Sequence, residues 1–218
     1  MRFIMNLCLG VVLLMSYTSS AVAEKLDWRL KRDRSDIQVY VSDTGGTNLH
    51  SFKAVSRLNT TIPALVNLMR EMSVMEQWLD TCKEPKVIDE PDDFSRVIHM
   101  KNKAPFVFIS DRDLVLLQRF RKVDDNVVMV DLEDRGHMID HVPGYVRGGF
   151  NGHWKFTKLD EKLVEVEYLG LTDPNGKVAP WMANMAVLDV PFSTLKKIRK
   201  ILHGKSTQYD RPMIINLQ

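Results

Sequence analysis

Hydrophobic residues recur with two different periods along the chain, and the period changes between zones. In the first zone, apolar and polar residues alternate over 37–41, which is the pattern of a half-buried strand. Residues 28–30 predict a short helix before it, and residues 50–58 predict a second strand beyond a glycine-rich turn at 44–48. From 62 to 78 the apolar side chains repeat at helical spacing, after a Thr-Ile-Pro start that suits the first turn of a helix.

The second zone, residues 86–170, predicts one strand after another. Short runs of β-branched and apolar residues are separated by charged pairs and by Gly or Asp turns. Connections this short favour an antiparallel sheet, since parallel strands need longer crossovers. The predicted strands cover residues 97–100, 114–120, 127–132, 145–149, 153–156 and 163–169.

The third zone consists of one long predicted helix. A strong turn at 173–176 precedes an apolar helical pattern over 181–203, which Pro191 is expected to kink. The order of elements predicts an α+β fold with a curved antiparallel sheet and helices on one side. A long helix against such a sheet leaves a volume that side chains can fill or that can stay a cavity. Residues 205–218 are expected to form a loosely ordered C-terminal tail.

The first 23 residues predict a cleaved secretory signal peptide. Arg2 precedes an almost wholly apolar run over 4–15, and a small-residue stretch then ends in Ala21-Val22-Ala23. The apolar run is shorter than the roughly 20 residues that span a bilayer. We therefore expect cleavage after this motif, a folded domain over 24–204, and a periplasmic location.

Charge and cysteine content narrow the class of protein. The formal net charge is +2, including the arginine of the signal peptide. Such a chain gives no case for binding nucleic acid, which requires a strongly basic face. Without the signal peptide Cys82 is the only cysteine, so no internal disulfide can form. We expect a monomer stabilised by its core, as is common for bacterial periplasmic proteins.

Sequence motifs of enzymes and metal sites are missing. The chain has neither a Gly-x-Ser-x-Gly elbow nor a His-Glu-x-x-His pair. His137 and His141 are four residues apart, but Gly136 and Pro143 argue against the helix that would align them on a metal. Cys82 has no base beside it and is expected to be a buried structural thiol. We predict no catalytic residue, no metal and no cofactor.

A set of short motifs resembles a known family. The motifs are Trp28 followed by Ile37-Gln38-Val39-Tyr40, then Phe52-Lys53-Ala54-Val55, Trp78, Arg112-Asp113-Leu114-Val115, Gly152-His153-Trp154-Lys155-Phe156, and Asp173-Pro174-Asn175-Gly176 leading to Pro180-Trp181. In order and separation they resemble the START family, the steroidogenic acute regulatory-related lipid-transfer domains. The likeness covers nearly all of the chain after the signal peptide.

The resemblance implies a fold and a ligand. The fold would be a helix-grip fold, in which a curved antiparallel β-sheet wraps around a long C-terminal α-helix and encloses a hydrophobic cavity. The ligand would be a single phospholipid, fatty acid or sterol-like molecule, bound without a metal or an organic cofactor. Each buried methylene of such a ligand contributes about 0.8 kcal/mol to binding.

Two segments are candidates for a movable lid over this cavity. Residues 102–110 carry two aromatic side chains beside a proline, and residues 181–188 begin the closing helix with flexible methionines. A Met and Leu face is otherwise ordinary core, so the resemblance is what favours a cavity wall. The candidate ligand contacts in these segments are Phe106, Phe108, Trp181, Met182, Met185 and Leu188.

Arg112 and Asp113 have two interpretations, which the sequence leaves open. One is a structural ion pair that involves Arg147 or Asp173, because partly buried arginines are normally paired. The other places Arg112 against a lipid headgroup. We include Arg112 and Arg147 among the candidate ligand contacts.

The resemblance also points to two positions inside the cavity. Some sterol-binding members of the family carry an acidic and a basic residue there, on the strands either side of the lid loop. The matching positions in this chain look like His99 and Gln118. This pair departs from the family pattern, because neutral groups could hydrogen-bond a hydroxyl or an ester but could not form a buried ion pair.

Three hypotheses for function follow. The first is a periplasmic lipid-binding or lipid-transfer protein that contacts membranes transiently. The second is a helix-grip enzyme, a cyclase or hydrolase acting on a hydrophobic substrate, which needs polar residues deep in the cavity. Clustering of His99, Asp113, Gln118 and Arg147 around one ligand would favour it. The third is a module that senses a hydrophobic ligand or docks at a membrane, supported only by the basic cluster at 196–200.

Overall fold

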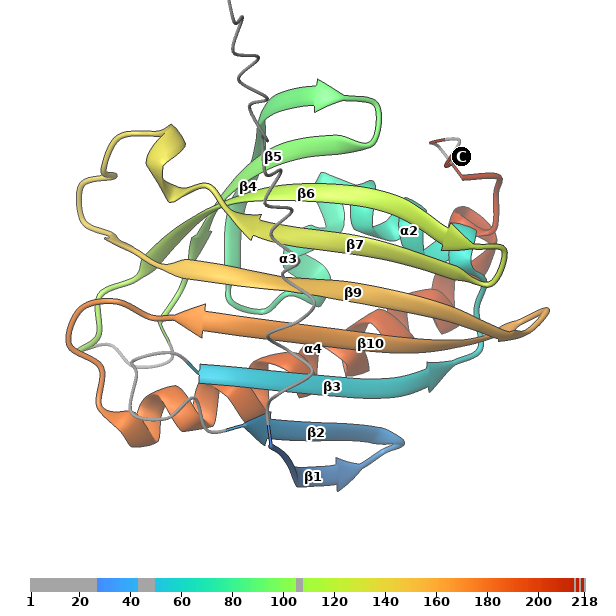
Figure 1. Ribbon diagram of the computed structural model, residues 1–218, viewed down its shortest axis with the longest axis horizontal. Coiled ribbons are helices and arrows are strands. Elements are labelled where there is room, and N and C mark those ends of the chain that lie inside the picture. Colours follow the sequence, from blue (N-terminus) through green and yellow to red (C-terminus); the bar gives the residue numbers. More distant parts are fainter. Residues whose placement is uncertain (1–26, 43–49, 105–107, 214, 216, 218) are drawn as a thin grey trace, which may run out of the picture.

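One long, curved antiparallel sheet organises the chain, and the helices lie together on one of its faces (Figure 1). The computed structural model describes residues 27–42, 50–104, 108–213, 215 and 217. Within these ranges the strand order is β1-β2-β3-β10-β9-β7-β6-β5-β4, with the short β8 beside β6. The strands are β1 (Trp28–Arg34), β2 (Ile37–Ser42), β3 (His50–Leu58), β4 (Cys82–Asp92), β5 (Ser95–Asn102), β6 (Arg112–Asp124), β7 (Val127–Asp134), β8 (Val146–Arg147), β9 (Gly149–Asp160) and β10 (Leu163–Asp173).

The helices cover the inner face of this sheet. Thr61 caps the first one, because its side chain accepts a hydrogen bond from the amide of Ala64 as the predicted helix start requires. The last one continues through Pro191 as a single helix. The helical elements are α2 (Ile62–Arg70), the 3-10 turn η1 (Met72–Val74), α3 (Met75–Trp78), the 3-10 turn η2 (Gly136–Met138) and α4 (Pro180–Tyr209).

This arrangement confirms the predicted α+β helix-grip architecture. Consecutive strands pair antiparallel from β1 to β3 and again from β4 to β7. The two groups are joined because β3 pairs with β10, β10 with β9 and β9 with β7. The long helix α4 packs against β2 and β3, and α2 and α3 pack against α4. None of the helices in the described ranges is both long and apolar enough to cross a bilayer.

A single large apolar core holds the sheet and helices together. The alternating residues of the strands, such as Val39 and Phe156, meet the apolar face of α4 at Leu195 and Ile198, and all four are fully buried. Burial of this kind contributes about 1.5–3 kcal/mol for each large side chain. Cys82 belongs to the same core, and burial raises the pKa of its thiol to about 12.

Two expectations about elements are wrong. Residues 28–30 form part of β1 rather than a helix, because Ser35 and Asp36 both take φ of 54° and turn the chain back into an antiparallel pair with β2. The strand β4 was missed altogether. Its sequence is rich in charge and contains Pro85 and Pro91, which an edge strand tolerates and an inner strand does not.

The expected loose tail over 205–218 is also wrong for the residues that the structure describes. The helix α4 extends to Tyr209, and Tyr209, Ile215 and Leu217 are buried in the main core. The buried amide of Asn67 donates to the carbonyl oxygens of Tyr209 and Arg211, at 3.1 and 3.2 Å. Apolar anchors and one amide therefore fix the C-terminal segment. The signal peptide and the turn at 44–48 lie outside the described residues.

Candidate functional site

A cavity of about 230 Å³ lies between the sheet and α4. Most of the side chains around it are apolar, which suits a hydrophobic ligand. The apolar and aromatic residues are Phe52, Met75, Trp78, Leu79, Ile98, Met100, Ala104, Ile109, Leu114, Leu116, Leu132, Phe150, Trp154, Tyr168, Val178, Met182, Ala183, Ala186, Val187 and Val190. The polar minority includes Thr81, Asn102, Lys103, Arg112, Gln118, Thr172 and Asp173.

The strands contribute to the cavity through every second residue. On β6 the contributing residues are Arg112, Leu114, Leu116 and Gln118, which lie on one face because side chains alternate along a strand. On β5, Ile98 and Met100 pair with Leu116 and Leu114, so they lie on the same face of the sheet and also line the cavity. His99 lies between these two and faces the opposite side of the sheet.

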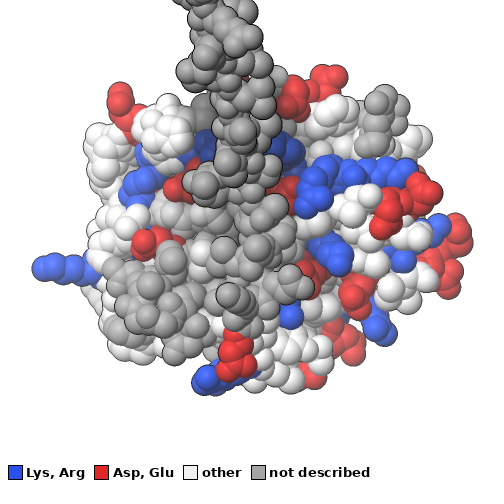
Figure 2. All heavy atoms as spheres, viewed as in Figure 1, with Lys and Arg blue, Asp and Glu red and all other residues white. Residues whose placement is uncertain are grey.

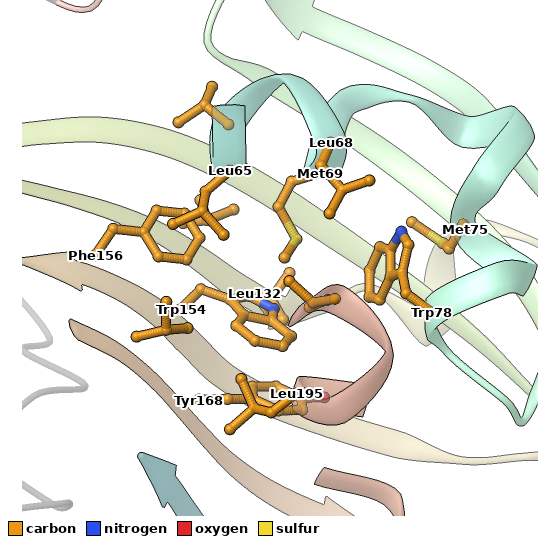
Figure 3. Close-up of a cluster of buried hydrophobic side chains, with 14 of the residues drawn as sticks. Leu65, Leu68, Met69, Met75, Trp78, Leu132, Trp154, Phe156, Tyr168 and Leu195 are labelled. Atoms are coloured by element: carbon orange, nitrogen blue, oxygen red, sulfur yellow. The ribbon is translucent and has the colours of Figure 1, made fainter. Parts of the chain in front are cut away.

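Aromatic rings form much of the wall. Figure 3 shows three of them, Trp78, Trp154 and Tyr168, within the buried apolar cluster. Trp154 and Tyr168 stack face to face with ring centroids 3.8 Å apart and an interplanar angle of 4°. Trp78 from α3 meets Trp154 edge-on at 6.3 Å, and Phe52 meets Tyr168 edge-on at 4.9 Å. Burial raises the pKa of the Tyr168 phenol, so this hydroxyl stays neutral. The result is a rigid aromatic surface on which an apolar chain can pack.

The helix α4 faces the cavity with a different set of residues from those predicted. Its lining residues are Met182, Ala183, Ala186, Val187 and Val190, which fall within one arc at about 100° per residue. Trp181, Met185 and Leu188 fall outside that arc and do not line the cavity, and Trp181 is 54% and Met185 45% exposed. Of the four residues predicted on this helix, only Met182 lies at the cavity.

The lid loop contributes through Ile109. Phe108 is 72% exposed and does not line the cavity, and Phe106 lies outside the described residues. A pattern of alternating aromatic residues identifies an apolar loop, but it cannot show which side chains turn inward. Ile109 carried no signal of its own beyond its position in that loop.

Arg112 ties the two segments at the edge of the cavity together. Its guanidinium donates to the carbonyl oxygen of Ser110 in the lid loop, and to those of Pro174 at 3.0 Å and Asn175 at 2.9 Å before α4. Burial lowers the pKa of this guanidinium. Arg112 lines the cavity, but each of its three nitrogens already binds a carbonyl, so the structure shows a positioning contact. Contact with a headgroup stays a prediction.

Asp113 is the centre of an ion-paired cluster on the outer face of the sheet. Its side chain is fully buried, and its Oδ2 atom lies 2.9 Å from Nη2 of Arg147 and 3.2 Å from Nε2 of His99. Arg147 also donates to the carbonyls of Gly136 and Asp140 in the loop between β7 and β8. The ion pair of Asp113 with Arg147 confirms the structural interpretation for Asp113.

His99 and Arg147, which were predicted to contact the ligand, do not line the cavity. His99, Asp113 and Arg147 lie on the outer face while Gln118 lies inside, so the four residues do not surround one cavity. His99 was placed in the cavity by its sequence separation from Arg112-Asp113. The pairing of β5 with β6 decides which face of the sheet it lies on, and puts it on the outer face. No group of three or more His, Cys, Asp or Glu side chains in the described ranges is placed to hold a metal.

A buried arginine that sequence reasoning missed contacts the cavity residue Gln118. Arg96 on β5 donates from Nε to Oε1 of Gln118 at 2.7 Å, and its other two nitrogens bind the carbonyls of Met69 and Arg70. Its two-residue spacing from Ile98 and Met100 was the signal that could have placed it on the inner face.

Comparisons with known proteins agree with this geometry. A family model described as the START domain matches residues 14–206. An uncharacterised protein of Pseudomonas aeruginosa is 26% identical over 200 residues, covering 91% of this chain and 97% of its own. A STAR-related lipid transfer protein from Xanthomonas axonopodis is 28% identical with a TM-score of 0.74, covering 81% of this chain and 98% of that structure.

Human STARD10 shares the fold at lower identity. Its crystal structure is 16% identical with a TM-score of 0.70, and covers 88% of this chain and 81% of its own. The family model covers most of the chain, and the ordered motifs, the sheet topology and the cavity under α4 are consistent with it. This chain belongs to the START domain family.

Proposed function

We propose that this protein binds a single lipid in the cavity between the sheet and α4, and carries or presents it in the periplasm. The observation that carries the proposal is the cavity itself, whose walls are aromatic and aliphatic with few polar groups. The similar Xanthomonas protein is described as a lipid transfer protein. The apolar wall suits the hydrocarbon part of a phospholipid, a fatty acid or a sterol-like molecule.

Native mass spectrometry tests lipid binding directly. Protein purified from its own host is expected to carry one co-purifying lipid per chain, which organic extraction identifies. Protein that is always empty, and that takes up no phospholipid, fatty acid or sterol when these are added, would rule out the proposal. Cell fractionation and N-terminal sequencing test the location, with a periplasmic product that begins at Glu24 as the expected result.

Transient contact with a membrane surface supports loading and release. Three exposed apolar side chains flank the cavity, Phe108 on the lid loop and Trp181 and Met185 on the first turns of α4. Aromatic and apolar side chains of this kind partition into the membrane interface. We infer that the lid loop and the start of α4 meet the membrane when the lipid passes.

The proposed role is non-enzymatic. The enzyme hypothesis would be favoured by a cluster of four polar side chains around one substrate, but the sheet separates three of them from the fourth. A bound lipid is expected to be recovered chemically unchanged after prolonged incubation with the protein. Time-dependent conversion of the lipid would support a cyclase or hydrolase instead.

A further inference from the structure

The strand β4 is an edge of the sheet that none of the strands in the described ranges covers. It pairs with β5 on one side only, and Figure 1 shows the two strands together at the upper edge of the sheet. Apart from Cys82 and Pro85, every residue of β4 is exposed. An edge of this length offers free backbone groups to a further strand. The expectation of a monomer was formed without β4, which the sequence patterns did not predict.

Repeated bulges bring four charged side chains of β4 onto one face of the sheet. The register with β5 shifts between Lys83 and Lys86, and again on either side of Asp89. Residues three apart on β4 therefore oppose residues two apart on β5. The pairs are Lys83 with Lys101, Lys86 with His99, Asp89 with Val97, and Asp92 with Ser95. Because alternate residues of β5 share a face, the four charged residues lie in a row on the outer face.

This row consists of two cations followed by two anions, so it is complementary to itself when reversed. In an antiparallel pair of two β4 strands with Val87 opposite Ile88, Lys86 of each copy opposes Asp89 of the other. In the same register Lys83 opposes Asp92. A twofold axis makes each of these contacts twice. Opposite charges on neighbouring strands stabilise the pairing, and like charges destabilise it.

Other registers of the same two strands are disfavoured by Glu84. In the register described above, Glu84 lies opposite Pro91 and no two like charges oppose each other. A displacement by one or two residues in either direction places Glu84 opposite an acidic residue instead. These acidic residues are Asp89, Glu90, Asp92 and Asp93. The charge pattern therefore selects one register.

The central residues of β4 are available for a second copy. In the described ranges the salt bridges of β4 involve Lys83, Glu84 and Glu90, and neither Lys86 nor Asp89 forms one. The two apolar residues between them, Val87 and Ile88, are 38% and 39% exposed. The centre of the strand thus offers an apolar pair flanked by two charges without salt-bridge partners.

Two prolines limit the extent of the pairing. Proline has no N–H group to donate, so Pro85 and Pro91 interrupt backbone pairing on either side of residues 86–90. So short a contact falls in the class of interfaces that bury less than about 1,200 Å², which are weak or transient. We therefore expect a dissociation constant in the micromolar range rather than a permanent dimer.

We propose that the protein forms a twofold homodimer through antiparallel pairing of β4 with β4 of a second copy. One continuous sheet would then run through both copies. The helix α4 packs against β2 and β3, at the other end of the strand order, so each copy keeps its own cavity. This proposal concerns assembly and is independent of the proposed lipid binding.

Sedimentation velocity of the purified protein measures the association. The wild type should change from monomer to dimer as its concentration rises through the micromolar range. High salt should weaken the dimer, because salt screens interactions between exposed charges. A monomer at every concentration in low salt would overturn the proposal. Species that keep growing beyond a dimer would overturn it too, because they indicate head-to-tail contacts between different edges.

Reversing one charge at a time tests the register. Lys86→Glu places two acidic groups opposite each other, and Asp89→Lys places two cations opposite each other, so each variant alone should dimerise at least about tenfold more weakly. An equimolar mixture of the two variants should dimerise again. In that mixed dimer the introduced glutamate faces the introduced lysine, and the native Asp89 of one chain faces the native Lys86 of the other. Failure of the mixture to associate would overturn the register, and an unchanged dimer in either single variant would place the interface elsewhere.

Lys31→Glu is the matched control. Lys31 is exposed on β1, the opposite edge of the sheet, and the substitution makes the same change of charge as Lys86→Glu. Dimerisation of this variant should stay within about twofold of the wild type, because the site is far from β4. A loss equal to that of Lys86→Glu would show that net charge, rather than pairing of β4, governs association. Thermal unfolding shows that each variant is folded before its association is compared.

Discussion

Gly170 lies where two aromatic rings of the cavity wall approach the backbone of β10. A Cβ atom at this position would stand 2.6 Å from the Phe52 ring and 2.8 Å from the Phe150 ring. Gly170→Ala should therefore displace both rings and destabilise the protein by about 1–3 kcal/mol, the usual cost of overpacking. Lipid affinity should fall too, because both rings line the cavity.

Urea unfolding and lipid titration measure these two effects. Gly149→Ala is the matched control, since the nearest atom to its Cβ would be 3.5 Å away and its backbone is not in the left-handed region. This control should change stability by less than about 1 kcal/mol. Equal stabilities of the two variants would show that the rings move aside freely.

Asp113 allows stability to be separated from binding. Asp113→Asn leaves Arg147 without the carboxylate that compensates its charge, which should destabilise the protein by about 3 kcal/mol. The cluster lies on the outer face of the sheet, so lipid affinity in the folded variant should stay within about twofold of wild type. Chemical unfolding and lipid titration test both halves, and a large loss of affinity would place Asp113 in the binding machinery.

At the scale of elements, α4 predicts opposite effects for two neighbouring residues. Ala186 faces the cavity and Met185 faces solvent. Ala186→Trp should fill the cavity and abolish stoichiometric lipid binding, whereas Met185→Trp should bind lipid as the wild type does. Native mass spectrometry of the two variants gives the lipid occupancy. Full occupancy of folded Ala186→Trp protein would show that the lipid lies elsewhere.

Alternation and helical spacing predicted most elements because they report which residues are apolar. The strands of the second zone and the start of α2 came from these patterns. Which side chains point into the cavity was harder to predict. The helix α4 carries apolar residues on its cavity side and on its other sides, as Met182 and Met185 show. The faces of Gln118 and His99 depend on strand register, and register comes from pairing that a single strand does not encode.

Edge strands escaped prediction for a related reason. The burial that creates a hydrophobic period is weak in β1 and β4, whose residues are mostly exposed. The aromatic wall was similarly hidden, because Trp78, Trp154 and Tyr168 come from three separate elements and meet only in the folded protein. The sequence pattern therefore predicts which residues of a single strand share a face. Which strands and helices come together around the cavity is decided by the topology of the fold.

At the scale of the whole molecule, the distribution of charged side chains on the face in view does not mark a membrane-binding surface. Figure 2 shows cationic and anionic side chains interspersed on the face in view. Oppositely charged side chains also pair between neighbouring strands, as Arg57 does with Glu165 and Arg121 with Asp131. We therefore expect the exposed apolar side chains beside the cavity, rather than a basic surface, to govern contact with lipid vesicles.

Lipid transfer between vesicles tests this view of the whole molecule. Phe108→Ser removes an exposed aromatic side chain of the lid loop that does not line the cavity, so it should leave equilibrium affinity nearly unchanged. The transfer rate should fall by up to about tenfold, because inserting a phenylalanine into the interface contributes roughly 1.5 kcal/mol. Leu159→Ser is the matched control, since Leu159 is also exposed but lies near the β9–β10 turn, at the opposite end of the sheet from the start of α4 (Figure 1). Equal transfer rates for the two variants would show that exchange proceeds without the lid loop entering the membrane, through free diffusion of the lipid to an open cavity.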